Sequence, residues 1–119
     1  MKVYVYEKCG TCRKALKWLE ERGVAHQTAP IRETPPSKTA LKKMLRAKNG
    51  EMKKLFNTSS KDYRDPAVKD KLPELSVDEA LSLLNSKGNL VKRPFVLAGD
   101  EVALLGFKEE EWEAALGSR

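Results

Sequence analysis

The first third of the chain alternates between the two hydrophobic periods that distinguish strands from helices. Lys2–Tyr6 alternates polar with β-branched or aromatic residues, which is the period-2 pattern of a strand. Apolar residues then recur at helical spacing over Thr11–Arg22, and Gly23 follows as a C-terminal cap. Val24–Ile31 is expected to form a second strand with Pro30 near its end, because proline cannot donate to a sheet ladder. This order predicts a βαβ unit with a right-handed crossover.

The middle of the chain is predicted to be helical. A double proline at positions 35–36 ends the first unit, and a helix is expected over Ser37–Lys48, capped by its serine. Shorter helical pieces are expected in Met52–Phe56 and Lys61–Lys71. A further helix, Ser76–Asn85, opens with the S-x-x-E pattern of a capping box.

The last part of the chain returns to strands. Pro94–Leu97 and Val102–Leu105 flank a turn at Ala98–Glu101, which predicts a hairpin, and an acidic helix follows at about Glu109–Leu116. The whole order is βαβ followed by ββα, with a helical insert at about residues 36–88 between the two units. It predicts an α/β protein with one mixed sheet covered by helices.

The composition agrees with a single folded domain. A domain usually takes ~100–200 residues, so a chain of 119 residues has room for one compact unit over residues 1–119. With 40% apolar and 34% charged residues, the chain is too hydrophobic for wholesale disorder. No apolar run approaches the ~18 residues that a membrane span requires. We therefore expect a soluble, folded protein that does not enter the membrane. We also expect it to be a monomer.

Cysteine usage and the N-terminus indicate a reducing compartment. Met1-Lys2 leads directly into the first predicted strand. The positively charged segment, long apolar stretch and cleavage site that make up a secretory signal are not seen there. Two cysteines three positions apart constrain very little unfolded chain, so they cannot staple a small secreted scaffold. We expect a cytoplasmic protein whose cysteines serve chemistry or metal binding.

Positive charge is concentrated in the helical middle. The formal charge is +6, and residues 35–72 carry eleven basic and four acidic side chains, whereas residues 73–119 carry five and nine. The basic stretch Lys42–Lys48 is compatible with an acidic partner or nucleic acid, but such a run is more often the solvated face of an amphipathic helix, which is the interpretation we favour. No aromatic residue is interleaved in it, so no direct nucleic-acid binding is expected.

The clearest chemical feature is Cys-Gly-Thr-Cys at positions 9–12, between a predicted strand and the first turn of a predicted helix. The free amides and partial positive charge of a helix N-terminus favour a thiolate, and Lys8 and Arg13 add cationic charge. The same amides can cradle an oxyanion. Cys9 is expected to be the more exposed and more reactive sulfur. Cys12, one helical turn in, is placed to attack a disulfide formed on Cys9.

Two other interpretations compete with a redox-active cysteine pair. A structural zinc site needs four ligands, and only the two sulfurs and the distant His26 are available, so no metal is expected. The pair could also be buried in the core, but a loop that holds Gly10 and Thr11 between two cationic residues is poorly suited to burial. A reactive pair is therefore favoured. Gly10, Thr11 and Arg13 are candidate residues of the substrate-binding loop.

Arg93-Pro94 is the second candidate feature. In a βαβ-ββα sheet the loop before the third strand comes close to the start of the first helix, and a proline there can be cis. Arg93 would then face the cysteine loop and could fork onto an oxyanion held at Cys9. From these two residues alone, a proline at the start of a strand preceded by a solvated arginine is an equally good interpretation.

These features resemble the ArsC/Spx family, which comprises glutaredoxin-linked arsenate reductases, their uncharacterised relatives and the Spx transcription regulators. The resemblance spans essentially the whole chain and implies a thioredoxin/glutaredoxin-like fold with a helical insertion. It rests on the Cys-Gly-Thr-Cys motif, Asn57–Arg64, Leu72–Ser76, Lys92–Pro94 and Gly106–Glu110.

The resemblance implies a role for each matching residue. Cys9 matches the nucleophilic cysteine that attacks arsenate, giving an adduct that glutathione and glutaredoxin resolve. Arg93 matches an oxyanion-binding arginine, and Pro94 matches the cis-proline of thioredoxin-like folds. Cys12 fits the two-cysteine pattern of Spx, so a disulfide between Cys9 and Cys12 is expected. No bound cofactor is implied, and glutathione is the expected co-substrate.

The chain departs from the family at two places. Ser59 stands where arsenate reductases and Spx have an arginine, and Gly106–Lys108 lies where the reductases have their last oxyanion arginine. A dianion would be held less well by one guanidinium and helix amides than by three arginines, since each charge-assisted hydrogen bond is worth ~1.5–3 kcal/mol.

Together these observations predict a thiol-dependent oxidoreductase of arsenate reductase type, with Cys9 as nucleophile, Cys12 as resolving thiol and Arg93 orienting the anion. The expected partners are a small oxyanion, glutathione, and glutaredoxin or thioredoxin. The alternative is an Spx-like redox-sensing transcription regulator that binds the C-terminal domain of the RNA polymerase α subunit.

Overall fold

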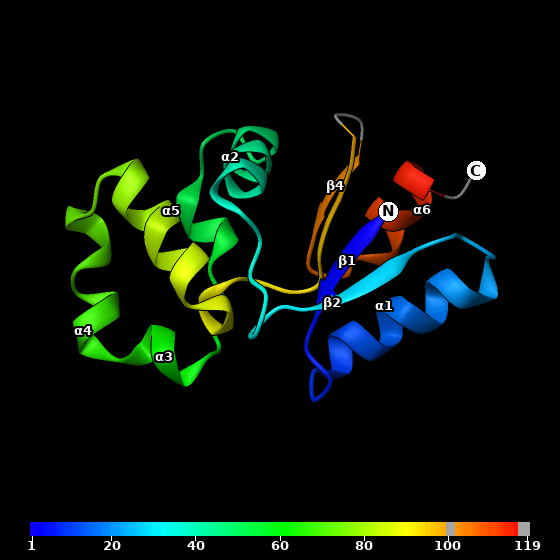
Figure 1. The fold of residues 1–119 in the computed structure, drawn as a ribbon, viewed down its shortest axis with the longest axis horizontal. Helices are drawn as coiled ribbons and strands as arrows, with labels where there is room; N and C mark the ends of the chain where they lie inside the picture. The colour runs from blue at the N-terminus through cyan, green and yellow to red at the C-terminus, as the bar shows by residue number, and fades with distance from the viewer. Residues whose placement is uncertain (100–101, 117–119) are drawn as a thin grey trace.

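The protein is built on a four-stranded mixed sheet with the order β2-β1-β3-β4 (Figure 1). The computed structural model describes residues 1–99 and 102–116. The strands are β1 (Lys2–Val5), β2 (Gln27–Pro30), β3 (Phe95–Ala98) and β4 (Val102–Leu105). β1 runs parallel to β2 and antiparallel to β3, and β3 and β4 form an antiparallel hairpin. The predicted βαβ and ββα units are confirmed, while Asp100 and Glu101 of the expected turn lie outside the described residues.

Helices cover both faces of the sheet. The α-helices are α1 (Gly10–Glu21), α2 (Lys38–Ala47), α3 (Lys61–Arg64), α4 (Pro66–Lys69), α5 (Val77–Ser86) and α6 (Glu109–Leu116), and the 3-10 helices are η1 (Met52–Leu55), η2 (Leu72–Glu74) and η3 (Gly88–Leu90). Figure 1 shows α2 to α5 grouped to one side of the sheet, away from α1 and α6. In the part of the chain that the structure describes, no helix has the length and apolar character needed to cross a membrane.

Side-chain alternation along the strands divides the hydrophobic core in two. Val3 of β1 and its register partner Val96 of β3 pack in the cluster formed with α1 and α6. Tyr4 and its partner Phe95 point to the opposite face, where they pack edge to face at 5.7 Å between ring centroids and join the cluster of the insert. Because successive side chains of a strand alternate, Tyr6 also lies on the insert side, at the start of the loop that leads to α1.

The expected second strand, Val24–Ile31, is shorter than predicted and begins only at Gln27. Gly23 adopts a left-handed conformation with φ of +65°, and the amide of Val24 donates back to the carbonyl of Leu19 at 3.0 Å. The residues after α1 therefore still close the helix end. The chain reaches the edge of β1 at Gln27, whose amide donates to the Met1 carbonyl at 2.8 Å.

A short hydrogen-bonded strip ties the insert to the sheet directly before β3. The amide of Lys92 donates to the carbonyl of Leu55 at 2.8 Å, and the amide of Asn57 donates to the carbonyl of Leu90 at 2.7 Å. An antiparallel β-bridge lies between these two bonds. The strip places the insert loop at residues 57–60 beside the segment that carries Arg93.

Candidate active site

Cys9 caps the first turn of α1. Its backbone is extended, with φ of -92° and ψ of 113°, and its Sγ accepts a hydrogen bond from the Cys12 amide at 3.3 Å, as the oxygen of an N-cap serine would. The amide of Cys9 donates to the carbonyl of Tyr6 at 3.0 Å and closes the preceding turn. The half-buried sulfur thus lies at the positive end of the helix, where a thiolate is electrostatically favoured.

The two thiols differ in acidity. Partial burial acts to raise the pKa of Cys9, but hydrogen bonds from Cys12 and Arg93 and the positive charge of Arg93 outweigh it, so this pKa is lowered from its ordinary value. Burial is also the largest cause at Cys12, where the hydrogen bond with Cys9 adds to it and the pKa is raised to about 12. The pair therefore combines a thiol that ionises readily with a buried thiol that stays protonated at neutral pH.

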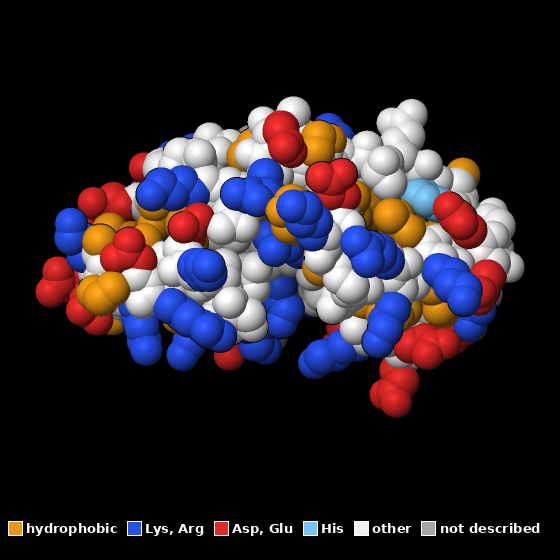
Figure 2. Space-filling model, turned by 90° about the horizontal axis from the view of Figure 1, so that it is seen from below, with side chains coloured by type: hydrophobic (Ala, Val, Ile, Leu, Met, Phe, Trp, Pro, Cys, Tyr) orange, Lys and Arg blue, Asp and Glu red, His pale blue; other side chains and the backbone are white. Residues whose placement is uncertain are grey.

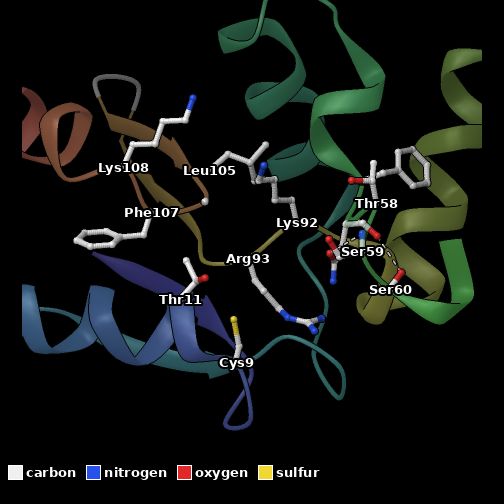
Figure 3. A pocket seen from close by; sticks show the side chains of 13 residues that line it. Cys9, Thr11, Thr58, Ser59, Ser60, Lys92, Arg93, Leu105, Phe107 and Lys108 are labelled. Carbon is white, nitrogen blue, oxygen red and sulfur yellow. Dashed lines mark hydrogen bonds between the residues drawn. The ribbon is translucent and has the colours of Figure 1, made fainter. Parts of the chain in front are cut away.

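Arg93 reaches the cysteine loop from the segment before β3. The Arg93-Pro94 peptide bond is cis, the isomer that the resemblance implies. The side chain of Arg93 extends toward the loop that carries Cys9 (Figure 3). Its guanidinium carbon lies 4.9 Å from the ring centroid of Tyr6, and its Nη1 donates to Oδ1 of Asn89 at 3.4 Å. Arg93 is thereby held by contacts with Tyr6 and Asn89.

A hydrogen-bond chain connects Arg93 to the helical insert. Nδ2 of Asn89 donates to Oδ2 of Asp62 at 2.7 Å, while Oδ1 of Asn89 accepts from Arg93. Asp62 lies in α3, so a single amide bridges a carboxylate of the insert and the guanidinium of the site. The carboxylate of Asp62 can only accept hydrogen bonds, so the NH2 group of Asn89 must face it. The amide oxygen Oδ1 of Asn89 is then turned toward the guanidinium of Arg93. The insert therefore takes part in orienting Arg93.

Cys9 opens into a pocket of about 470 Å³. Its walls are the start of α1, the insert loop at residues 56–60, the segment before β3 and the end of β4 (Figure 3). Lys92, Arg93 and Lys108 contribute positive charge, and no Asp or Glu of the described residues lines the pocket. Within residues 1–99 and 102–116, no three His, Cys, Asp or Glu side chains gather as metal ligands would. The pocket is suited to an anion beside the sulfur.

The other residues predicted for the site occupy different positions. Thr11 lines the pocket, and Gly10 is exposed with nothing within 4 Å of the place a Cβ would take, which leaves room for a ligand to approach the backbone. Cys12 and Pro94 are buried behind the pocket lining. Arg13 lies outside that lining, and its Nε donates at 3.1 Å to a backbone carbonyl of the preceding loop.

Sequence reasoning does not single out three residues that surround Arg93, namely Tyr6, Arg32 and Asn89. Tyr6 and Arg32 follow the carboxyl ends of the parallel strands β1 and β2, and these ends meet at one edge of the sheet. Nη1 of Arg32 donates to the hydroxyl of Tyr6 at 3.0 Å. Polar residues at the carboxyl ends of two predicted parallel strands, Tyr6 as the last residue of one and Arg32 directly after the other, are the signal that could have found this pair.

A cysteine pair at the start of the first helix, opposite a cis-proline on a β2-β1-β3-β4 sheet, defines the thioredoxin-like class of folds. The helical insert between β2 and β3 distinguishes this chain from thioredoxin-like proteins that lack such an insert. The chain belongs to the ArsC family, whose family model matches residues 4–115.

Relatives of the chain include an uncharacterised protein, a regulator and a presumed enzyme. The chain is 49% identical over 110 residues to the uncharacterized protein YusI of Bacillus subtilis, which covers 92% of each chain. It is 32% identical over 110 residues to the global transcriptional regulator Spx 2 of Bacillus cereus, which covers 92% of this chain and 81% of the regulator. The crystal structure of a possible arsenate reductase from Streptococcus mutans aligns with a TM-score of 0.84 and 36% identity, and covers 94% of this chain and 96% of that one.

Proposed function

We propose that the protein is a thiol-dependent oxidoreductase of arsenate reductase type. The observation that carries the proposal is the division of acidity between the two cysteines. Cys9 has a lowered pKa beside Arg93, and Cys12 is buried with a pKa of about 12. A nucleophile must be a thiolate at working pH, and a resolving thiol must not compete with it for the first attack. This arrangement supports Cys9 as nucleophile and Cys12 as resolving residue.

In the proposed reaction the Cys9 thiolate attacks an oxyanion or a disulfide. With arsenate, a bond forms between the Cys9 sulfur and arsenic, and a protonated oxygen leaves as water. Cys12 then loses its proton and attacks the Cys9 sulfur. A disulfide forms, and the electron pair of the sulfur–arsenic bond remains on arsenic, which leaves as arsenite. Two thiols, from glutathione with glutaredoxin or from thioredoxin, reduce the Cys9–Cys12 disulfide.

The pocket supports a wider substrate choice than arsenate alone. Ser59 and Gly106–Lys108 line it at the positions where the resemblance places two oxyanion arginines. Each missing charge-assisted hydrogen bond weakens the hold on a dianion by ~1.5–3 kcal/mol. A disulfide needs less charge compensation, because only one thiolate leaves in the first step. We therefore include small disulfides in the proposed substrate class.

Coupled oxidation of NADPH tests the proposal. One assay supplies arsenate with glutathione, glutaredoxin and glutathione reductase, and the other supplies a small disulfide with thioredoxin and thioredoxin reductase. Wild-type protein is expected to turn over at least one substrate, and Cys9→Ser neither. Cys12→Ser should retain arsenate turnover only where glutathione can replace the resolving thiol. Turnover at the Cys9→Ser background in both assays would refute the enzyme proposal.

A second candidate function is that of an Spx-like redox-sensing regulator. Identity of 32% to the regulator Spx 2 favours it, as does the exposure of the basic residues Lys42 and Arg46 on α2. The resemblance implies the C-terminal domain of the RNA polymerase α subunit as partner and the Cys9–Cys12 disulfide as switch. A pull-down with this domain, using oxidised protein, reduced protein and Cys9→Ser, tests the candidate. Equal absence of binding in all three samples would exclude it.

A further inference from the structure

Arg32 and Arg93 approach the same aromatic ring beside the cysteine. The guanidinium carbon of Arg93 lies 4.9 Å from the ring centroid of Tyr6, and that of Arg32 lies 5.0 Å from the same centroid. The hydrogen bond from Arg32 to the hydroxyl of Tyr6, at 3.0 Å, fixes the direction of the exposed guanidinium. Tyr6 is joined to the reactive residue in turn, because the amide of Cys9 donates to its carbonyl at 3.0 Å.

Among the described residues, neither Arg32 nor Arg93 forms an ion pair with a carboxylate, and Arg32 has no thiolate partner of the kind that Arg93 has in Cys9. Two positive charges near one ring repel each other, and an anion bound at Arg32 reduces this repulsion. Figure 2, which looks onto the face at the start of α1 and α3, shows further Lys and Arg side chains spread across it. This face therefore favours a ligand with negative charge.

We propose that Arg32, fixed by Tyr6, forms a subsite for the carboxylate of a small disulfide whose sulfur is attacked by Cys9. The inference rests on the proposed function and names its substrate class, a low-molecular-weight disulfide with a carboxylate on each thiol half. Arg32 lies outside the lining of the Cys9 pocket and is bonded to the hydroxyl of Tyr6, whose ring also contacts Arg93 of that lining. A short anionic chain that contacts Arg32 would therefore extend past Arg93 to bring its sulfur to the thiolate.

The exchange proceeds in two steps. The Cys9 thiolate attacks one sulfur of the disulfide, a bond forms between the two sulfurs, the substrate S–S bond breaks, and one half leaves as a thiolate. Cys12 loses its proton and attacks the Cys9 sulfur, which displaces the second half as a thiolate. The two cysteines are oxidised to a disulfide, and the substrate disulfide is reduced to two thiols.

Disulfides of matched chain length and different charge test the subsite. Reduced protein is mixed with 3,3′-dithiodipropionate, its neutral bis-amide or the cationic cystamine, and the rate of thiol–disulfide exchange is measured. Each rate is divided by the rate at which a small free thiol reacts with the same disulfide. Arg32→Gln should lower the normalised rate with dithiodipropionate about two- to fivefold, the range of one exposed ion pair, and leave the bis-amide rate unchanged. Arg32→Glu should deepen this loss and raise the cystamine rate. Arg64→Gln, which removes an exposed guanidinium outside the pocket lining, is the matched control.

Two results would overturn the subsite. One is an equal loss with the anionic and the neutral disulfide in Arg32→Gln, and the other is the same selective loss in Arg64→Gln. Failure of the proposed function is a different result, because wild-type protein would then exchange with none of the three disulfides.

Discussion

Arg93→Met removes the guanidinium that lowers the pKa of Cys9 and keeps an unbranched side chain against Tyr6. Burial raises the pKa of Cys9, and both the hydrogen bond and the charge of Arg93 lower it. The substitution leaves burial unopposed by these two effects, so the pKa of Cys9 should rise. At a pH below this pKa, the variant should contain less thiolate than the wild type.

The size of the effect follows from the position of the sulfur. A hydrogen bond to a charged group is worth ~1.5–3 kcal/mol, and the partial exposure of Cys9 reduces this to about 1 kcal/mol because solvent screens the charge. This free energy corresponds to about fivefold less thiolate, and the more basic thiolate is about twofold more nucleophilic, since its reactivity rises with roughly the half power of its basicity. The net loss of rate at low pH is therefore about twofold, and above the pKa of the variant its rate should exceed the wild-type rate by about the same factor.

Alkylation by iodoacetamide across a pH series measures both effects, with mass spectrometry of the peptides to separate Cys9 from Cys12. The rate profiles of wild type and Arg93→Met should cross. Arg64→Met, which removes an exposed guanidinium outside the pocket lining, should follow the wild-type profile. Superimposed profiles for Arg93→Met and wild type, or an equal displacement in Arg64→Met, would refute the assignment of Arg93 as the group that stabilises the thiolate.

Three further variants test other features. Asn89→Ala should displace the alkylation profile in the same direction as Arg93→Met but by less, because Asn89 contacts Arg93. The matched variant Asn85→Ala loses a hydrogen bond to the carbonyl of Pro36 and should leave the profile in place. Equal profiles for the two variants would count against the hydrogen-bond chain. Gly88→Ala should lower the free energy of unfolding, measured by urea denaturation, by ~3 kcal/mol, because its Cβ would lie 1.8 Å from the carbonyl oxygen of Ile31. Gly10→Ala should not lower it, because nothing lies within 4 Å of that Cβ. Equal urea midpoints for the two variants would contradict this packing argument. Cys12→Ser should accumulate a mixed disulfide on Cys9 after addition of oxidised glutathione, seen as a mass increase, and equal accumulation in the wild type would mean that Cys12 does not resolve it.

The sheet and its flanking helices could be predicted because their signals are local. The alternation in Lys2–Val5 and the helical spacing after Gly10 each depend on residues within a few positions of one another. The capping box is equally local, since Ser76 and Glu79 exchange hydrogen bonds of 3.0 and 3.1 Å across three positions. The position of Cys9 at a helix start follows from the same kind of signal.

The surroundings of Arg93 could not be predicted in this way, because they join residues that are distant in sequence. Arg32 and Tyr6 are 26 positions apart, and Asn89 and Asp62 are 27 apart. Taken singly, each of these residues is an ordinary polar residue of a loop, strand end or short helix. Only the packing of the insert against the sheet brings them together. Proximity in sequence also misleads, since Arg13 is close to Cys9 along the chain and lies outside the pocket lining.

The strip that joins the insert to the segment before β3 makes the opening of the pocket measurable without any substrate. The insert loop and Arg93 cannot separate unless the amide hydrogen bonds of Lys92 and Asn57 break. A ligand too wide for the closed pocket would enter only through a state in which both amides meet water. Amide hydrogen exchange at these two positions therefore reports how often the insert lifts from the sheet. Exchange faster than at Val96, in the centre of the sheet, would identify the insert as a unit that opens on its own.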